Sequence, residues 1–88
     1  RDQNYPNPFN PHTTIKFSVP NESFVSIHIF DMLGRQIKTL TSSPRQAGEY
    51  SIQWNGDDNA GFPVSSGTYI YRIHAGNYVQ SKKMLYLK

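Results

Sequence analysis

Hydrophobic and polar residues alternate with a period of two along most of the chain, a pattern typical of half-buried β-strands. The clearest examples are residues 13–19 and 24–30, each of which places three apolar side chains on one face. Residues 20–22, Pro-Asn-Glu, form the turn between them. The same alternation predicts four more strands, over residues 35–40, 49–54, 68–74 and 78–88. The sequence therefore predicts an all-β protein.

Glycine, proline and short polar residues mark the connections between these strands. Residues 31–34 predict a short hairpin loop in which Gly34 supplies a positive φ, so we expect a structural role for Gly34. Residues 41–48 contain serine, proline and glycine and predict a solvated connection. Residues 55–67 predict the longest loop, and residues 75–77 predict a tight turn.

The apolar residues of the last predicted strand fall into two sets of opposite parity. These sets are Val79, Leu85 and Leu87 on one side, and Tyr78, Met84 and Tyr86 on the other. We expect a β-bulge near Lys82 or Lys83, because one extra residue would bring both sets to the same face.

Strands at this regular spacing, with a short extended piece over residues 2–5 as a further candidate, predict an immunoglobulin-like antiparallel β-sandwich of about seven strands. We divide the chain into a proline-rich extended segment, residues 1–12, and one sandwich domain, residues 13–88. Tyr69 is predicted to form a tyrosine corner, in which a buried hydroxyl binds nearby backbone. The predicted core comprises Ile15, Phe17, Val25, Ile27, Ile29, Ile37, Ile52, Trp54, Tyr71 and Ile73.

Composition narrows the class of protein. A chain of 88 residues supports one small domain, and its apolar runs fall far short of the ~20 residues that a membrane-spanning helix needs. The absence of cysteine excludes disulfides and thiolate metal sites. The net charge of +3 is mild, and basic residues cluster only at Lys82, Lys83 and Lys88. We therefore expect neither nucleic-acid binding nor a direct membrane span.

No motif for catalysis or cofactor binding occurs in the sequence. His28 and His74 are predicted on strand faces opposite the core, where two imidazoles without a third ligand are more often surface residues than a metal site. The six acidic residues show no setting that would tune an acid–base pair. We expect a protein that is not an enzyme and has no cofactor, no metal site and no catalytic residue.

Two local features suggest binding at first sight. Residues 55–61, Asn-Gly-Asp-Asp-Asn-Ala-Gly, look like a calcium loop. Counted from Asp57, however, Gly61 occupies a ligand position and Thr68 stands where a bidentate glutamate is needed, so a turn that binds its own backbone is favoured. Trp54 could belong to a carbohydrate-binding platform, but it shares the parity of Ile52, which favours the core.

An ordered set of short motifs carries the strongest functional signal. Residues 4–11, Asn-Tyr-Pro-Asn-Pro-Phe-Asn-Pro, form a stiff segment, because prolines fix φ and remove backbone donors. The later motifs are Phe30-Asp31-Met32-Leu33-Gly34-Arg35, Trp54-Asn55-Gly56-Asp57, Gly61-Phe62-Pro63-Val64, Gly67-Thr68-Tyr69 and Lys83-Met84. Over nearly the whole chain this order resembles the C-terminal sorting domain (type A) of the type IX secretion system. Residues 25–73 are also similar to the immunoglobulin-like domain of the flagellar hook-capping protein.

The resemblance implies a non-catalytic sorting and anchoring module at the C-terminus of an exported bacterial protein. The cargo would be an N-terminal domain of the same polypeptide. The partners would be the outer-membrane type IX secretion machinery and its C-terminal-signal peptidase. The cargo would pass through the periplasm and end in the medium or on the outer cell surface.

By matching positions, the resemblance also assigns roles to residues. The recognised residues would be Pro6, Pro8, Phe9, Pro11, Gly67, Tyr69, Lys82, Lys83, Met84, Leu85, Leu87 and Lys88, and the structural ones Gly34, Trp54 and Gly56. Tyr86 departs from the strictly aliphatic tail that is common in this family. Two alternatives stay open: a structural immunoglobulin-like domain of an extracellular or flagellar hook-capping assembly, and a glycan-binding accessory module.

Overall fold

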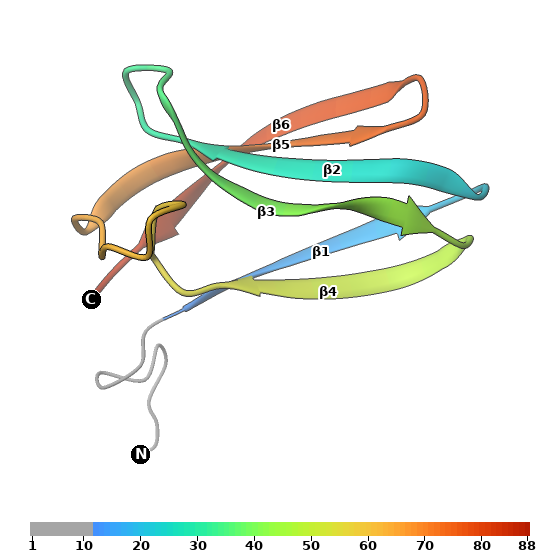
Figure 1. The fold of residues 1–88 in the computed structure, drawn as a ribbon. Coiled ribbons are helices and arrows are strands. Elements are labelled where there is room, and N and C mark those ends of the chain that lie inside the picture. Colours follow the sequence, from blue (N-terminus) through green and yellow to red (C-terminus); the bar gives the residue numbers. More distant parts are fainter. Residues whose placement is uncertain (1–11) are drawn as a thin grey trace, which may run out of the picture.

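The computed structural model describes residues 12–88, which form β-strands and no helix (Figure 1). The strands are β1 (Thr13–Val19), β2 (Ser23–Phe30), β3 (Gln36–Arg45), β4 (Gly48–Trp54), β5 (Gly67–Ala75) and β6 (Tyr78–Tyr86). The predicted all-β class is confirmed, with six strands in this part of the chain. The candidate strand over residues 2–5 and the extended segment before His12 lie outside the described residues.

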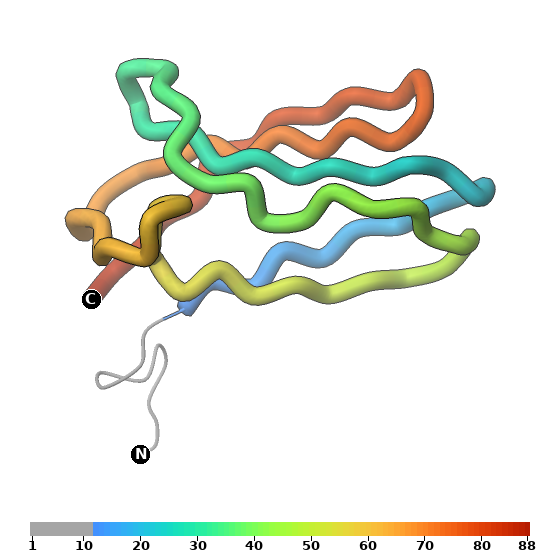
Figure 2. Tube along the Cα trace, viewed as in Figure 1, coloured from blue at the N-terminus to red at the C-terminus, as the bar shows by residue number. Residues whose placement is uncertain are grey.

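The strands form two antiparallel sheets that pack as the two layers of a sandwich (Figures 1 and 2). One sheet holds only β1 and β4, and the other has the strand order β3-β2-β5-β6. The chain passes between the layers after β1, after β3 and after β4, whereas β2–β3 and β5–β6 are hairpins within the larger sheet. Two strands therefore face four.

The core lies between the layers and is built from the inward positions of the strands. In β2 the inward Val25, Ile27 and Ile29 are fully buried, as the period of two predicts. Burial of each such side chain contributes about 1.5–3 kcal/mol. All predicted core residues are buried except Ile37 and Ile52, which are partly buried and pack against the core. The structure adds Val19, Tyr69, Ala75 and Tyr86 to the core.

The third strand is longer than predicted. Residues 41–48 were expected to form a solvated connection, but β3 continues to Arg45, which pairs with Ser23 of β2. β3 is an edge strand of its sheet, and an edge strand tolerates a proline such as Pro44. The Arg45 guanidinium lies 4.9 Å from the centroid of the Tyr50 ring and donates a 2.8 Å hydrogen bond to the Thr41 hydroxyl. The strand therefore continues because its side chains pack against β4, although its serine and proline residues indicate a loop.

The last strand has no bulge, so that expectation is wrong. The ladder between β5 and β6 runs without a register shift from Tyr78 opposite Ala75 to Tyr86 opposite Gly67. Because side chains alternate strictly along the strand, the set that contains Tyr86 points inward and the set that contains Leu85 points outward. The side chains of Val79, Leu85 and Leu87 therefore stay exposed and do not join the core.

The loop between β2 and β3 has the conformation expected of it. Gly34 has φ +85°, and the Asp31 carboxylate accepts hydrogen bonds from the amides of Leu33 and Arg35. The hydrogen bond from the Arg35 amide is the main cause that lowers the pKa of Asp31. Desolvation opposes it, and the Arg35 side chain at 2.7 Å and the Leu33 amide lower the pKa further. The predicted positive φ of Gly34 is confirmed.

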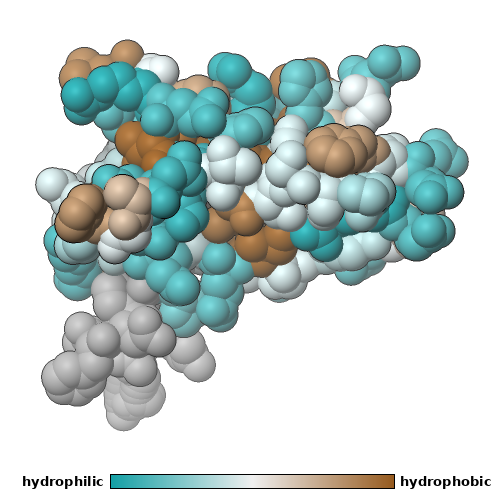
Figure 3. All heavy atoms as spheres, viewed as in Figure 1, coloured by the Kyte–Doolittle hydropathy of each residue, from teal (hydrophilic) through white to brown (hydrophobic). Residues whose placement is uncertain are grey.

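The visible surface is mostly hydrophilic, and hydrophobic side chains emerge between the two layers (Figure 3). The core of this small sandwich therefore reaches the surface on the side shown in this view.

Candidate recognition surface around the last strand

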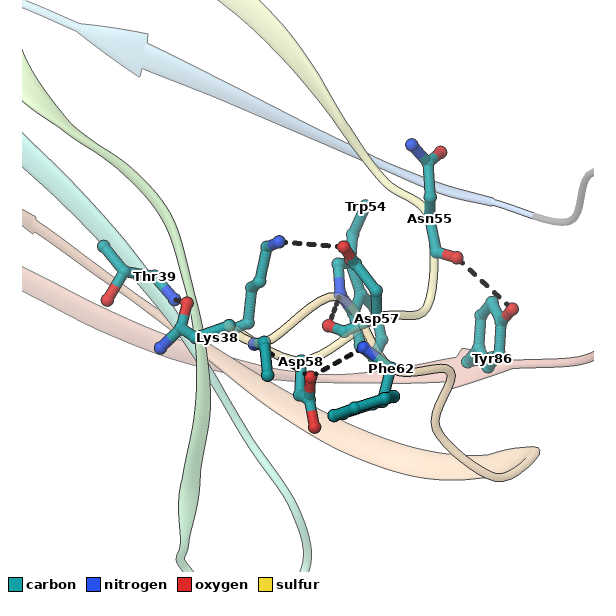
Figure 4. A network of polar contacts seen from close by, with 10 residues as sticks. Lys38, Thr39, Trp54, Asn55, Asp57, Asp58, Phe62 and Tyr86 are labelled. Carbon is teal, nitrogen blue, oxygen red and sulfur yellow. Dashed lines mark hydrogen bonds and ion pairs between the residues drawn. The ribbon is translucent and has the colours of Figure 1, made fainter.

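Trp54, Gly56, Tyr69 and Tyr86 form a closed cluster at one end of the sandwich, which we call the aromatic corner. Trp54 is fully buried, and its ring centroid lies 5.1 Å from that of Tyr69 and 5.3 Å from that of Tyr86. Its indole N–H donates a 2.9 Å hydrogen bond to the Asp57 carbonyl (Figure 4). The prediction that Trp54 belongs to the core is confirmed, which removes it from any carbohydrate platform.

Gly56 is required at this corner for two reasons. Its φ is +73°, a conformation that side chains rarely adopt. A Cβ atom at this position would also overlap the ring of Tyr86, which is only 3% exposed. Burial, followed by the charge of Asp57, raises the pKa of the Tyr86 hydroxyl. Gly56 and Tyr86 lie thirty positions apart, and no sequence signal connected them.

Tyr69 forms the predicted tyrosine corner. Its hydroxyl donates a 2.6 Å hydrogen bond to the carbonyl of Ser65, four residues upstream. Burial is the largest cause of a raised pKa at this hydroxyl, with smaller contributions from Asp31 and Tyr86. Tyr69 therefore fixes the end of the long loop to the start of β5. Its predicted part in sorting remains a prediction.

Residues 55–61 form a loop that we call the acidic loop. Its side-chain oxygens accept hydrogen bonds from the loop's own backbone and also bind β3 (Figure 4). One Asp58 carboxylate oxygen accepts hydrogen bonds from the amides of Ala60 and Phe62. The Asn59 side chain accepts one from the Thr39 amide, and Lys38 forms a 2.9 Å ion pair with Asp57. The favoured turn that binds its own backbone is confirmed at Asp58, whereas the contacts to β3 were not predicted.

His28 and His74 lie on the outer face of the larger sheet, opposite the core, as predicted. The register places Ser26 opposite His74 and Arg72 opposite His28, so the two imidazoles are diagonal neighbours on adjacent strands. Within residues 12–88 no group of three metal-ligating side chains occurs.

The two faces of β6 differ in what they offer to a partner. Tyr86 points inward and is buried, and Met84 is half-buried against the core. On the outward side, Lys83 and Leu85 are exposed, and Leu87, just after the end of the strand, is exposed as well; we call these three residues the tail face. Leu85 is 58% exposed and Leu87 49%. The predicted recognition tail is thus divided between the core and the solvent.

The other predicted recognition residues lie close to this strand or outside the described chain. Gly67 is paired with Tyr86 across the β5–β6 ladder. Lys88 is exposed, and its backbone amide donates a 3.0 Å hydrogen bond to the Ser66 hydroxyl. Lys82 shares the inward parity of Tyr86 but is exposed. The remaining four, Pro6, Pro8, Phe9 and Pro11, are outside the described residues.

A groove between β1 and β6, which sequence reasoning missed, completes this surface. We call it the edge groove; it has a volume of about 440 Å³ and is lined by Lys16, Phe17, Tyr71, Ile73, Tyr78 and Lys82, among others. The one sequence feature that indicates this groove is the shared parity of Tyr78, Lys82 and Tyr86.

Comparison with known proteins agrees with this architecture. The family described as the FlgD Ig-like domain matches residues 9–78. The chain belongs to the FlgD Ig-like domain family. This membership confirms the immunoglobulin-like class and one of the two resemblances found in the sequence. No curated protein matches the chain.

The solved structures that resemble this FlgD Ig-like domain include those of FlgD and PorU. FlgD from P. aeruginosa is 22% identical with a TM-score of 0.68, and the match covers 86% of this chain and 60% of that one. Dimeric latent PorU from Porphyromonas gingivalis is 20% identical with a TM-score of 0.68, and the match covers 92% of this chain and 8% of that one. At these identities the likeness shows the fold. Among residues 12–88, no helix has the length and apolar character needed to cross a membrane.

Proposed function

We propose that this FlgD Ig-like domain is a non-catalytic sorting and anchoring module, which directs an exported bacterial protein through the type IX secretion system to the cell surface or the medium. The observation that carries the proposal is the exposure of the tail face on an edge strand. Leu85 and Leu87 lie in solvent beside Lys83, although an isolated domain gains no stability from exposing them. A surface of this kind can be recognised by a partner.

The position of β6 suits recognition by an export machinery. Within residues 12–88, β6 forms a ladder with β5 alone, so its other edge presents backbone groups outside the ladder, of which the Leu85 carbonyl accepts a hydrogen bond from the Thr13 hydroxyl. A partner can pair with such an edge and read alternate side chains for specificity. The proposed partners are the outer-membrane type IX machinery and its C-terminal-signal peptidase, with a cargo domain N-terminal to this module in the same polypeptide.

Two further observations support a module carried by a longer protein. The ordered motifs of the sequence resemble the type A sorting domain. The fold also occurs within PorU, where the matched part is 8% of the chain, so it exists as a small unit of a much longer polypeptide. The side chains of the acidic loop are engaged with backbone and with Lys38, which leaves them a structural role and supports a function other than catalysis.

The burial of Tyr86 decides which variants can test this proposal. Deletion of residues 82–88 would remove Tyr86 from the core, so a transport defect would report unfolding. We suggest the double variant Leu85→Thr, Leu87→Thr, which changes only exposed side chains. Val79→Thr is the matched control, because Val79 is an outward residue of the same strand and is 50% exposed.

Each variant is fused to a reporter with an N-terminal export signal and expressed in a host that has the type IX machinery. We expect the double variant to accumulate in the periplasm with an unchanged thermal midpoint, while the Val79→Thr fusion reaches the surface. Delivery of the double variant to the surface at the level of the unaltered domain would contradict the tail face as the recognised element.

The second candidate is a structural immunoglobulin-like domain in an extracellular or flagellar hook-capping assembly. The family match over residues 9–78 and the likeness to FlgD favour it. The same fusion separates the two functions, because a purely structural domain would leave the reporter in the periplasm even when unaltered. The glycan-binding alternative loses its best candidate, since Trp54 is buried.

A further inference from the structure

The edge groove lies on the opposite side of β6 from the tail face. Its floor is the inward surface of β5 and β6, where Tyr71 and Ile73 are buried and Tyr78 is 52% exposed. Its wall is the middle of β1, at Lys16 and Phe17. Its volume of about 440 Å³ is in the range of clefts that bind ligands.

The groove exists because the two layers have unequal numbers of strands. In the part of the chain that the structure describes, the smaller sheet ends at β1, so no strand of that sheet covers the start of β6. Near the other end of β6 the two strands meet, where the Thr13 hydroxyl donates a 3.4 Å hydrogen bond to the Leu85 carbonyl. On the opposite side of the sandwich, Arg45 closes the gap by stacking on Tyr50.

The wall of the groove is a free strand edge. Within residues 12–88, β1 pairs with β4 alone, so alternate backbone N–H and C=O groups along β1 point away from β4 and toward the groove. An added strand about 4.8 Å from β1 would satisfy these groups. Its inward side chains would cover the exposed face of Tyr78 and the apolar floor beside Ile73. The site has the geometry that β-strand addition requires.

The charge of the groove determines which kind of strand can bind beside β1. Two lysines, Lys16 and Lys82, line the groove and no carboxylate does, and neither lysine forms an ion pair within residues 12–88. Lys16 is on the outer side of β1 and Lys82 is on the inner side of β6. A second copy that offered its own β1 or β6 would place lysine against lysine, which is unfavourable.

We propose that the edge groove binds an extended acidic segment of a partner protein, which adds to β1 as a third strand of the smaller sheet. Acidic side chains on its two faces lie beside Lys16 and Lys82, and apolar side chains between them cover Tyr71 and Ile73. This interaction uses a different surface from the tail face, so it can fail without affecting the sorting proposal.

The test uses two synthetic peptides of about seven residues, in which charged residues occupy the outward positions and one inward position and valines occupy the other inward positions. The charged residues are glutamates in one peptide and lysines in the other. Each is titrated into the isotope-labelled chain and followed by the backbone amide NMR signals. We expect the glutamate peptide to shift the amides of residues 16–18 and 80–82 in a saturable way and to slow hydrogen exchange along β1. We expect the lysine peptide to bind at least about tenfold more weakly.

Matched charge variants show whether the groove itself is responsible. The double variant Lys16→Glu, Lys82→Glu should reverse the preference between the two peptides. The control Lys83→Glu, Lys88→Glu makes the same change of net charge outside the groove and should keep the preference for glutamate.

Several outcomes would overturn the proposal. These are equal binding of the two peptides, shifts confined to other strands, a preference that only the control variant alters, and no shift at millimolar peptide. The last result would leave Lys16 and Lys82 as residues that only guard a strand edge against aggregation. Concentration-dependent self-association through residues 16–18 would identify a second copy of the chain as the occupant and would also refute the proposal.

Discussion

Tyr78 and Tyr86 occupy the two ends of β6 and point to the same side of the sheet, yet Tyr78 is 52% exposed and Tyr86 is 3% exposed. At the Tyr86 end, Trp54 and the long loop cover the strand and form the aromatic corner. At the Tyr78 end, no strand formed by residues 12–88 extends the smaller sheet over β6, and the edge groove remains. Parity thus determines where a side chain points, and a partner from elsewhere in the chain determines whether it is buried.

The comparison separates stability from recognition within one strand. The aromatic corner contains packed aromatic rings, Gly56 with its positive φ, and the hydrogen bond of the Tyr69 hydroxyl. Substitutions there therefore lower the free energy of unfolding. The open end and the tail face hold exposed side chains whose substitution leaves the core intact. We therefore expect the two regions to respond differently to mutation.

The largest expected effect comes from truncating the buried ring. Tyr86→Ala should lower the free energy of unfolding by about 3–5 kcal/mol, because it removes a packed aromatic ring and leaves a cavity beside Trp54. Tyr78→Ala is the matched control and should lose less than about 1 kcal/mol. Urea denaturation measures both. Similar losses for the two variants would contradict the division of β6 into a closed and an open end.

A glycine substitution tests how tightly the corner is closed. Gly56→Ala should cost about 2–4 kcal/mol, because a Cβ would both strain the backbone at φ +73° and overlap the Tyr86 ring. Gly61→Ala is the control, because Gly61 has φ +88° with open space around it, and should cost about 1 kcal/mol. Equal urea midpoints for the two variants would show that the Tyr86 ring moves aside without loss.

Alternation alone predicted the faces of the strands well, because each inward residue of β1, β2 and β5 found a partner in the opposite layer. Ile15, Ile27 and Ile73 were all predicted in the core and are buried. The same reasoning predicted the bond of Tyr69 and the conformation of Gly34, since both follow from local geometry. These features depend on residues near one another in the sequence.

The errors arose where distant segments decide the outcome. β3 extends to Arg45 because its side chains pack against β4, although serine and proline suggested a loop. The bulge in β6 was expected on the assumption that all its apolar residues would be buried, whereas Leu85 has no layer to cover it. The edge groove also depends on which strands face each other. A single sequence does not contain that information.

A smaller effect is expected from removing one hydroxyl at the corner. Tyr69→Phe should cost about 1–3 kcal/mol, because the Ser65 carbonyl loses a 2.6 Å hydrogen bond in a partly buried place. Tyr50→Phe is a close control, since its hydroxyl donates a bond of 2.7 Å to the carbonyl of Gln46, also four residues upstream but exposed. Water can replace that bond, so the control should cost less than about 1 kcal/mol. A higher cost for Tyr50→Phe would contradict the importance of burial at the corner.

The smallest expected effect is a dependence of stability on alkaline pH that originates at the corner. Burial, then the charges of Asp31 and Tyr86, raise the pKa of Tyr69 above its ordinary value. The unfolded chain therefore loses this proton first as pH rises. The stabilisation is complete below the unfolded pKa of about 10 and is lost as pH rises through the folded value.

We expect the urea midpoint to fall above about pH 10 and to fall less steeply in Tyr69→Phe. Some slope should remain in that variant, because the pKa of Tyr86 is also raised by burial. An identical slope in Tyr69→Phe and the unaltered chain would show that the Tyr69 hydroxyl is solvated in the folded state, and the corner would then be less closed than its geometry indicates.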